Sequence, residues 1–359
     1  MKPLCFLLLV LSLPMLLFSQ QKNAAPARPT LAAIQPTAAN PTTPAEFFAR
    51  ARQLSDLEAA GVPFHLKATY VATGDTEFTG KGTYEEWWQS KGVWRKEATL
   101  GNYKWVQIKN GPRSVALATA AYTPLRVRQI AGLKVFHIVL PQGMHDHWSM
   151  SSQPAADDTT DVATDEAPCD PRLKKILCIQ KYEFAANGVL LSYRDNDVSE
   201  TYSDFEPFGK LLFPRKVAVA LQDEPVDTAT VESLEPLAEN NIQRFDTKPI
   251  PGLTAIPTEV IETFPAPDLT PPKLIHGVKM KYPKSERKAH PKAVIIVQGT
   301  IDATGVIREP FIQLSGGAAL DNAALQAVRQ WKFKPATHHG HPVMVDLAVI
   351  VRFRGRRLF

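Results

Sequence analysis

Cysteine is scarce in this chain of 359 residues, which has three, at positions 5, 169 and 178. None of them forms the Cys-x-x-Cys spacing of a structural zinc site. A Gly-x-Ser-x-Gly nucleophile element is also missing, and the turn Ser315-Gly316-Gly317 lacks the Lys-Ser/Thr pair of a phosphate-binding loop. We therefore expect a protein that is not an enzyme and that needs no metal and no cofactor.

The apolar run at the N-terminus is short. Lys2 precedes about fifteen apolar residues, 4–18, which Pro14 interrupts, whereas a spanning helix needs about 20 residues. This pattern is typical of a signal peptide, which we place at residues 1–20. We expect a periplasmic protein that meets membranes through partners and not through a spanning helix. The alternative is that the segment stays uncleaved as an inner-membrane anchor.

Two cysteines then remain in the mature chain, Cys169 and Cys178, with eight residues between them. In an oxidising compartment this pair is a candidate disulfide, and two free or separately buried thiols are the alternative. The most ligand-like group is His145-Asp146-His147 with His137 upstream. A third and a fourth ligand are not evident, so we favour an exposed polar turn over a metal site. We interpret residues 338–341, His-His-Gly-His, as a surface turn as well.

The charge is unevenly distributed. Residues 273–359 hold 15 Lys and Arg against 5 Asp and Glu, a charge of about +10 that leaves about −5 on the rest of the chain. A basic face could attract nucleic acid or anionic lipid. We expect no nucleic-acid partner, because no basic groove with interleaved aromatic residues and no nucleic-acid motif accompanies the charge.

A flexible lead-in is expected at residues 21–42, followed by an N-terminal domain at 43–247. Thr43-Pro44-Ala45-Glu46 is a capping box that opens a helix ending at Gly61. Short alternating runs separated by Gly or Asn then predict antiparallel strands, and residues 124–139 indicate a further helix. The domain is expected to be a curved antiparallel sheet or half-barrel with a helix.

The string Tyr202-x-Asp204-Phe205…Gly209-x-x-x-Phe213-Pro214-x-x-Val217 resembles the LolA/LolB type of periplasmic lipoprotein carriers. The resemblance implies an incomplete barrel whose cavity holds a lipid or acyl ligand. Trp87, Trp88, Trp94 and Trp105 could line such a cavity. The alternative is a curved sheet filled by its own side chains.

Seven prolines fall between residues 248 and 272, and no apolar periodicity accompanies them. This composition predicts a semi-rigid, Pro-rich linker.

The C-terminal domain, 273–359, has the clearest pattern. Apolar and polar residues alternate over 293–301, Asp302 to Gly305 offers turn chemistry, and a second strand covers 306–314. Leu320, Ala324, Val328 and Trp331 share one helical face, Pro335 stops the helix, and a last strand covers about 343–353. We expect an α+β unit, a small antiparallel sheet packed on one helix.

The same region carries several specific motifs: Tyr282-Pro283, Ile301-Asp302…Gly305, Ser315-Gly316, Leu320-Asp321-x-Ala323-Ala324-Leu325-x-Ala327-Val328-x-x-Trp331-x-Phe333-x-Pro335-Ala336 and Gly340-x-Pro342-Val343. Together they resemble the C-terminal domain of TonB-type energy transducers. The resemblance implies an envelope module whose exposed strand edge pairs with an extended segment of an outer-membrane TonB-dependent transporter, by β-augmentation.

Two functions follow from these resemblances. The first is partner binding by strand addition, in the service of energy-coupled transport. The second is a carrier of lipid or another apolar ligand that the TonB-like domain docks to a membrane partner. For the first, the expected partner-binding edge is the last strand: Asp346, Leu347, Ala348, Val349, Ile350, Val351, Arg352 and Phe353.

Overall fold

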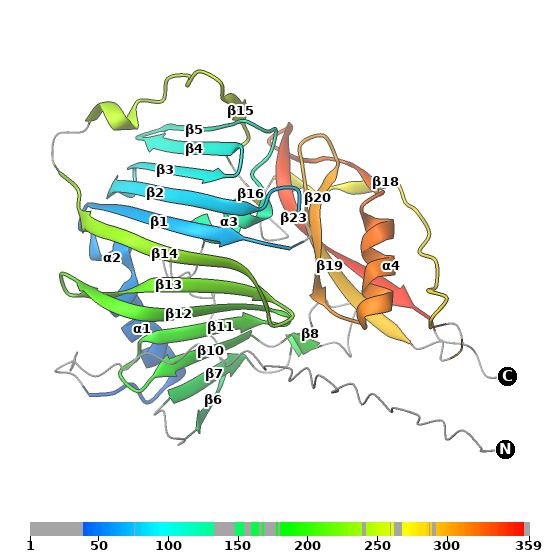
Figure 1. Ribbon diagram of the computed structural model, residues 1–359, viewed down its shortest axis with the longest axis horizontal. Helices are drawn as coiled ribbons and strands as arrows, with labels where there is room; N and C mark the ends of the chain where they lie inside the picture. The colour runs from blue at the N-terminus through cyan, green and yellow to red at the C-terminus, as the bar shows by residue number, and fades with distance from the viewer. Residues whose placement is uncertain are drawn as a thin grey trace, which may run out of the picture. The chain divides into compact units, whose positions relative to one another are not determined.

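The computed structural model describes residues 39–354, with gaps at 75, 133–147, 154–158, 165–166, 169–176, 179, 239–241, 259, 262–267, 287 and 289–291. Within these residues the protein is mostly β with few helices, and it has two principal sheets (Figure 1). The expected α+β class is confirmed. None of the described helices is both long and apolar enough to cross a bilayer.

Helix α1 (Pro44–Ser55) begins at the predicted capping box. The Thr43 hydroxyl accepts from the Glu46 amide, the Glu46 carboxylate accepts from the Thr43 amide, and Pro44 takes the first helical position. The sequence predicted one helix as far as Gly61, but Asp56 interrupts it and caps a second one, α2 (Leu57–Ala60). Gly61 ends α2 in a left-handed conformation, φ +68°.

The larger sheet has 13 strands in the described residues, and every pairing in it is antiparallel. Its spatial order is β15-β5-β4-β3-β2-β1-β14-β13-β12-β11-β10-β7-β6. The strands are β1 (Phe64–Ala72), β2 (Gly80–Ser90), β3 (Val93–Leu100), β4 (Tyr103–Asn110), β5 (Arg113–Ala118), β6 (Trp148–Gln153), β7 (Thr159–Thr164), β10 (Gln180–Ala185), β11 (Leu190–Asp195), β12 (Val198–Phe208), β13 (Leu211–Leu221), β14 (Glu224–Pro236) and β15 (Thr254–Ile256). A separate pair joins β8 (Ala167–Pro168) to β9 (Leu177–Cys178), and a 3₁₀ turn, η1, covers Ile242–Phe245.

One face of the larger sheet packs against helices α1 and α3 (Leu125–Ala131). Phe48 of α1 lies edge-on to Tyr182 and Phe184, at 4.8 and 5.4 Å between ring centroids. Val127 and Ile130 of α3 join the same buried cluster. Aromatic pairs of this geometry contribute beyond the area they bury. The expected curved sheet with a helix is confirmed.

The smaller sheet has the order β17-β22-β23-β19-β20, with β16 paired to β23 off that path. Its elements are β16 (Val260–Ile261), β17 (Leu269–Thr270), β19 (Ala293–Ile301), β20 (Ile307–Leu314), α4 (Ala318–Val328), β22 (Ala336–His338) and β23 (His341–Phe353). A two-stranded pair, β18 (Lys273–His276) with β21 (Lys332–Lys334), accompanies it. Leu320, Ala324 and Val328 of α4 are buried with Ile295 and Val297 of β19, so the helix lies on the sheet as predicted (Figure 1).

Four short strands occupy the region for which the proline content predicts a linker and the residues that follow it. β15 pairs with β5 of the larger sheet, whereas β16, β17 and β18 pair with strands of the C-terminal part. β15, β16 and β17 each lie between prolines, at 251, 257, 265, 267 and 271, and β18 follows Pro272. No proline falls within these strands, so each of their residues keeps the N–H that a ladder needs. Parts of the segment are therefore held against sheets, and the division of the chain into domains at residues 247 and 273 stays a prediction.

Candidate strand-binding edge

Strand β23 has two sides with different neighbours. On one side it pairs with β19 from Val345, opposite Ile301, to Phe353, opposite Ala293. On the other side β22 pairs with residues 341–343, and β16 pairs with Met344 and Val345. From residue 346 to 353 the described part of the chain places no strand on that second side. We call residues 346–353 on the side away from β19 the open edge.

The side chains of these eight residues alternate between two faces. Leu347, Val349, Val351 and Phe353 pack in the core of the smaller sheet. The alternate positions lie on the opposite face, where Ala348 and Arg352 are exposed and Asp346 and Ile350 are half-buried. The structure therefore brings the predicted edge residues together as one strand. That they receive a partner stays a prediction.

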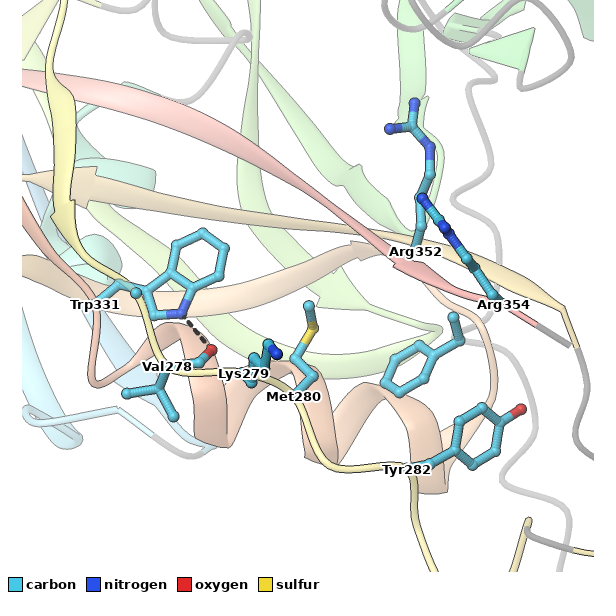
Figure 2. Close-up of a pocket in the computed structure, with 9 residues that line it drawn as sticks. Val278, Lys279, Met280, Tyr282, Trp331, Arg352 and Arg354 are labelled. Atoms are coloured by element: carbon cyan, nitrogen blue, oxygen red, sulfur yellow. Dashed lines mark hydrogen bonds between the residues drawn. The ribbon is translucent and has the colours of Figure 1, made fainter.

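A groove of about 480 Å³ opens beside the end of β23 (Figure 2). Residues 277–280 and Tyr282 line one side, and Trp331 and residues 352–354 complete it. The indole Nε1 of Trp331 donates to the carbonyl oxygen of Val278 at 3.1 Å, the bond drawn dashed in Figure 2. The rings of Tyr282 and Phe353 meet edge to face at 5.3 Å between centroids. These two contacts hold the segment 278–282, which forms one wall of the groove, against Trp331 just beyond the end of α4 and against Phe353 at the end of β23.

Three basic residues, Lys279, Arg352 and Arg354, line the groove and are exposed. In Figure 2 the side chains of Arg352 and Arg354 extend from the end of β23, and Met280 lies on the opposite side of the groove. Clefts lined by one sign of charge raise the local concentration of ligands of the opposite sign. The groove can therefore hold an apolar side chain beside an acidic one.

The turn before β20 ties the sheet to the strand that follows α4. The carboxylate of Asp302 accepts from the Thr304 and Val306 amides at 2.9 and 3.0 Å and from Arg308 Nε at 2.7 Å. Burial raises the pKa of Asp302, but these hydrogen bonds outweigh it and lower the pKa below its ordinary value. Gly305 has φ +84°, and its carbonyl oxygen accepts from the Phe333 amide at 2.8 Å. The predicted turn chemistry is confirmed.

The other face of β23 contacts helix α3. Arg128 Nη1 donates to both oxygens of Asp346, and Arg128 Nη2 donates to the Thr300 hydroxyl. Beside this pair the Leu125 amide donates to the carboxylate of Glu309, whose pKa burial raises. A second contact links the sheets where the Ser315 amide donates to Asp197 Oδ2 at 2.9 Å. Asp346, the first residue of the open edge, is thus held by its side chain.

The other candidates from the sequence are placed as follows. Cys178 lies in β9, while Cys169, His137 and residues 145–147 lie outside the described residues, so the disulfide stays a prediction. His338 and His341 face each other across the tight turn between β22 and β23. No group of three or more His, Cys, Asp or Glu in the described part of the chain could hold a metal ion.

The comparison with protein families decides the identity of this region. Residues 278–354 match the family described as Gram-negative bacterial TonB protein C-terminal. Residues 278–354 form a TonB C-terminal domain. The chain is also 35% identical over 78 residues to Protein TonB of Vibrio cholerae serotype O1. This match covers 21% of the chain and 32% of that protein, so the chain spans about a third of its relative's length.

The region before the TonB C-terminal domain is similar in fold to two solved structures of low sequence identity. One is a LolA superfamily protein from Nitrosomonas europaea, with a TM-score of 0.32, 8% identity, and coverage of 55% of this chain and 95% of the other. The second is described as an outer membrane lipoprotein-sorting protein domain from Vibrio parahaemolyticus, with a TM-score of 0.34, 9% identity, and coverage of 55% and 94%.

Side chains fill the helix-covered face of the larger sheet. Its fully buried rings are Phe48, Phe64, Tyr70, Tyr84, Tyr103, Phe184 and Phe213. Trp88 stacks on Phe64 inside this cluster, whereas Trp87 lies in a different one, stacked on His65 and beneath Arg244. The four tryptophans therefore do not form one surface. In the described residues, this packing favours a sheet filled by its own side chains over a cavity lined by the four tryptophans.

Sequence reasoning missed three features around the open edge of the TonB C-terminal domain. The ion pair from Arg128 and the pairing of β16 join residues far apart in the chain, and no local pattern marks them. The wall formed by residues 277–280 was also missed. The one available signal was the Tyr282-Pro283 motif, together with Trp331 just beyond the helix end.

Proposed function

We propose that this protein binds an extended segment of a TonB-dependent outer-membrane transporter in the cell envelope, by adding that segment as a strand to the open edge of β23. It acts by binding and not by catalysis, in energy-coupled transport. The observation that carries this proposal is that β23, inside a TonB C-terminal domain, has a neighbouring strand on only one side from residue 346 to 353 among the described residues.

Main-chain hydrogen bonds supply the affinity in this kind of recognition. An edge strand presents a row of N–H and C=O groups that a second strand can satisfy. The neighbouring groove supplies selectivity, because the guest's side chains can reach Met280 and Phe353 on its apolar surface and Arg352 on its rim. We therefore expect the guest to combine apolar and acidic residues.

Proline substitution tests the edge directly. The N–H groups of successive strand residues point to opposite sides, so of Ala348→Pro and Val349→Pro one removes a donor toward the open edge and the other a donor toward β19. We expect Val349→Pro to abolish guest binding with little cost to the fold, and Ala348→Pro to destabilise the domain. Binding is measured by fluorescence anisotropy with peptides from the periplasmic N-terminal segments of TonB-dependent transporters.

The two proline variants also control for the side of β23 toward which the N–H groups of Ala348 and Val349 point. If Val349 points its N–H toward β19, the two outcomes exchange places, and one variant still loses binding while it stays folded. Transporter peptides that bind both folded variants as tightly as the wild type would show that the guest does not pair with this edge.

A further inference from the structure

The side of β23 that carries the open edge already holds a strand of the same chain. Val260 and Ile261 of β16 pair in parallel with Met344 and Val345 of β23. Val345 therefore has a neighbour on both sides, Ile261 and, on β19, Ile301. The residue after it, Asp346, is the first of the open edge, so β16 ends where the open edge begins.

The segment that carries β16 is held on both sides of it. Three residues separate Ile256, the last residue of β15, from Val260, and β15 pairs with β5 in the larger sheet. On the other side β17 pairs with β22, with Leu269 opposite His338. A tethered strand meets its site at a high effective concentration, so even a short ladder can occupy it.

The ladder of β16 is nevertheless short, since among the described residues it joins two residue pairs. A guest strand that pairs over eight residues and extends to Met344 would form more main-chain hydrogen bonds than it displaces. The sequence next to β16 also has the character expected of a guest, because Glu259 and Glu262 flank the apolar pair Val260 and Ile261. The exposed arginines at the other end of β23 carry the opposite charge.

We infer that β16 is an intramolecular competitor for the edge of β23: it occupies the positions at Met344 and Val345, and a partner strand that extends over them must displace it. This inference rests on the proposed function, since it describes how the same edge is regulated. Its consequence is that a guest that extends over Met344 and Val345 binds more weakly to the wild-type chain than to a chain whose β16 is released.

Proline variants of β16 in the full chain test the competition. In a parallel ladder alternate residues of one strand bond to a given neighbour, so one of Val260→Pro and Ile261→Pro removes a donor toward β23. The probe is a fluorescent peptide with the sequence of residues 257–264. We expect one of the two variants to bind it about tenfold more tightly than the wild type does, with amide protection gained on binding at whichever of Met344 and Val345 directs its N–H toward the open side of β23.

Ala255→Pro is the matched control, because it places proline in the same segment but in β15, opposite Leu117 of β5. Its affinity for the probe should equal that of the wild type. Unchanged affinity in both β16 variants would overturn the inference, and so would an equal rise in Ala255→Pro, which would indicate a general loosening of the segment. Light scattering checks whether the probe instead links two copies of the chain, and that result would also overturn the inference.

Titration of the same proteins with transporter peptides separates this inference from the proposed function. Transporter peptides that bind the wild type and the β16 variants equally would leave the proposed function standing and refute the competition. If the probe binds a β16 variant while no transporter peptide binds any protein, the competition stands and the proposed partner is wrong.

Discussion

Arg128 of helix α3 and Asp346 of strand β23 form a two-pronged ion pair, with Arg128 Nη1 at 2.9 and 2.8 Å from the two carboxylate oxygens. Their side chains are 17% and 13% exposed. The Thr300 hydroxyl donates to the same carboxylate at 2.6 Å. The pair joins residues 218 positions apart and ties the first residue of the open edge to the helix under the larger sheet.

Removal of one partner should destabilise the protein, because the remaining charge stays shielded from water. We expect Arg128→Met and Asp346→Asn each to lower the free energy of unfolding, with a coupling energy of about 1–3 kcal/mol in the double-mutant cycle. Urea unfolding of the two single variants and the double variant gives this energy. Additive effects would mean that the two side chains do not interact in solution.

Gly305 is expected to be irreplaceable, whereas Gly340 is not. Both have positive φ, +84° and +80°. A Cβ on Gly305 would lie 1.9 Å from the carbonyl oxygen of Phe333, but a Cβ on Gly340 would meet nothing within 4 Å. Gly340→Ala should cost about 1 kcal/mol of backbone strain, and Gly305→Ala about 3 kcal/mol or more, since strain and overlap add. Equal losses in thermal unfolding would contradict this.

Asp227 should make the protein less stable as the pH rises. It is fully buried in β14, and neither of its carboxylate oxygens has a hydrogen-bond partner among the described residues. Burial raises the pKa of Asp227 to about 8, and the Arg126 guanidinium lowers it by less. Between the unfolded pKa, about 4, and 8, the folded state therefore keeps a proton that the unfolded state releases.

Stability contributed by the protonated form is therefore present at low pH and is lost as pH rises through this window, by at most about 1.4 kcal/mol per pH unit. Chemical unfolding at several pH values measures the slope. Asp227→Asn should flatten it, while Asp223→Asn, an exposed carboxylate paired with Arg194, should leave it unchanged. A slope that Asp227→Asn does not alter would refute the assignment.

Arg352 should contribute to guest binding through its charge. Arg352→Glu reverses a charge on the groove rim and should weaken binding of an acidic transporter peptide about two- to fivefold, since exposed pairs contribute up to about 1 kcal/mol. Added salt should reduce the difference. Lys292→Glu, an exposed site just before β19 that does not line the groove, is the matched control. Equal effects of the two variants would indicate net charge and not the groove.

Local patterns in the sequence predicted local structure well. The strand predicted at 293–301 has those bounds in the structure, because its alternation reflects one buried face. The turn at Asp302 and the capping box at Thr43 were predicted because each depends on residues at most four positions apart. The helix predicted at 320–331 ends at Val328, and Trp331 turns back to Val278 instead.

Relationships between distant segments could not be predicted in this way. The proline content of 248–272 indicated a linker, because proline removes ladder donors, yet two- and three-residue strands fit between the prolines. The predicted edge at residues 346–353 came from a family resemblance. The two features at the start of this edge, β16 and Arg128, depend on tertiary contacts, which leave no periodic signal in the sequence. Regulation of the edge is inferred from one of these contacts, the pairing of β16 with β23.

Amide hydrogen exchange of the full chain, with and without a transporter peptide, tests strand addition most directly. A guest strand on the open edge should protect alternate amides between residues 346 and 353, while the amides bonded to β19 stay as slow as before. The same peptide should leave the amides of the larger sheet unchanged. Saturating peptide that binds without slowing any amide between residues 346 and 353 would contradict the account.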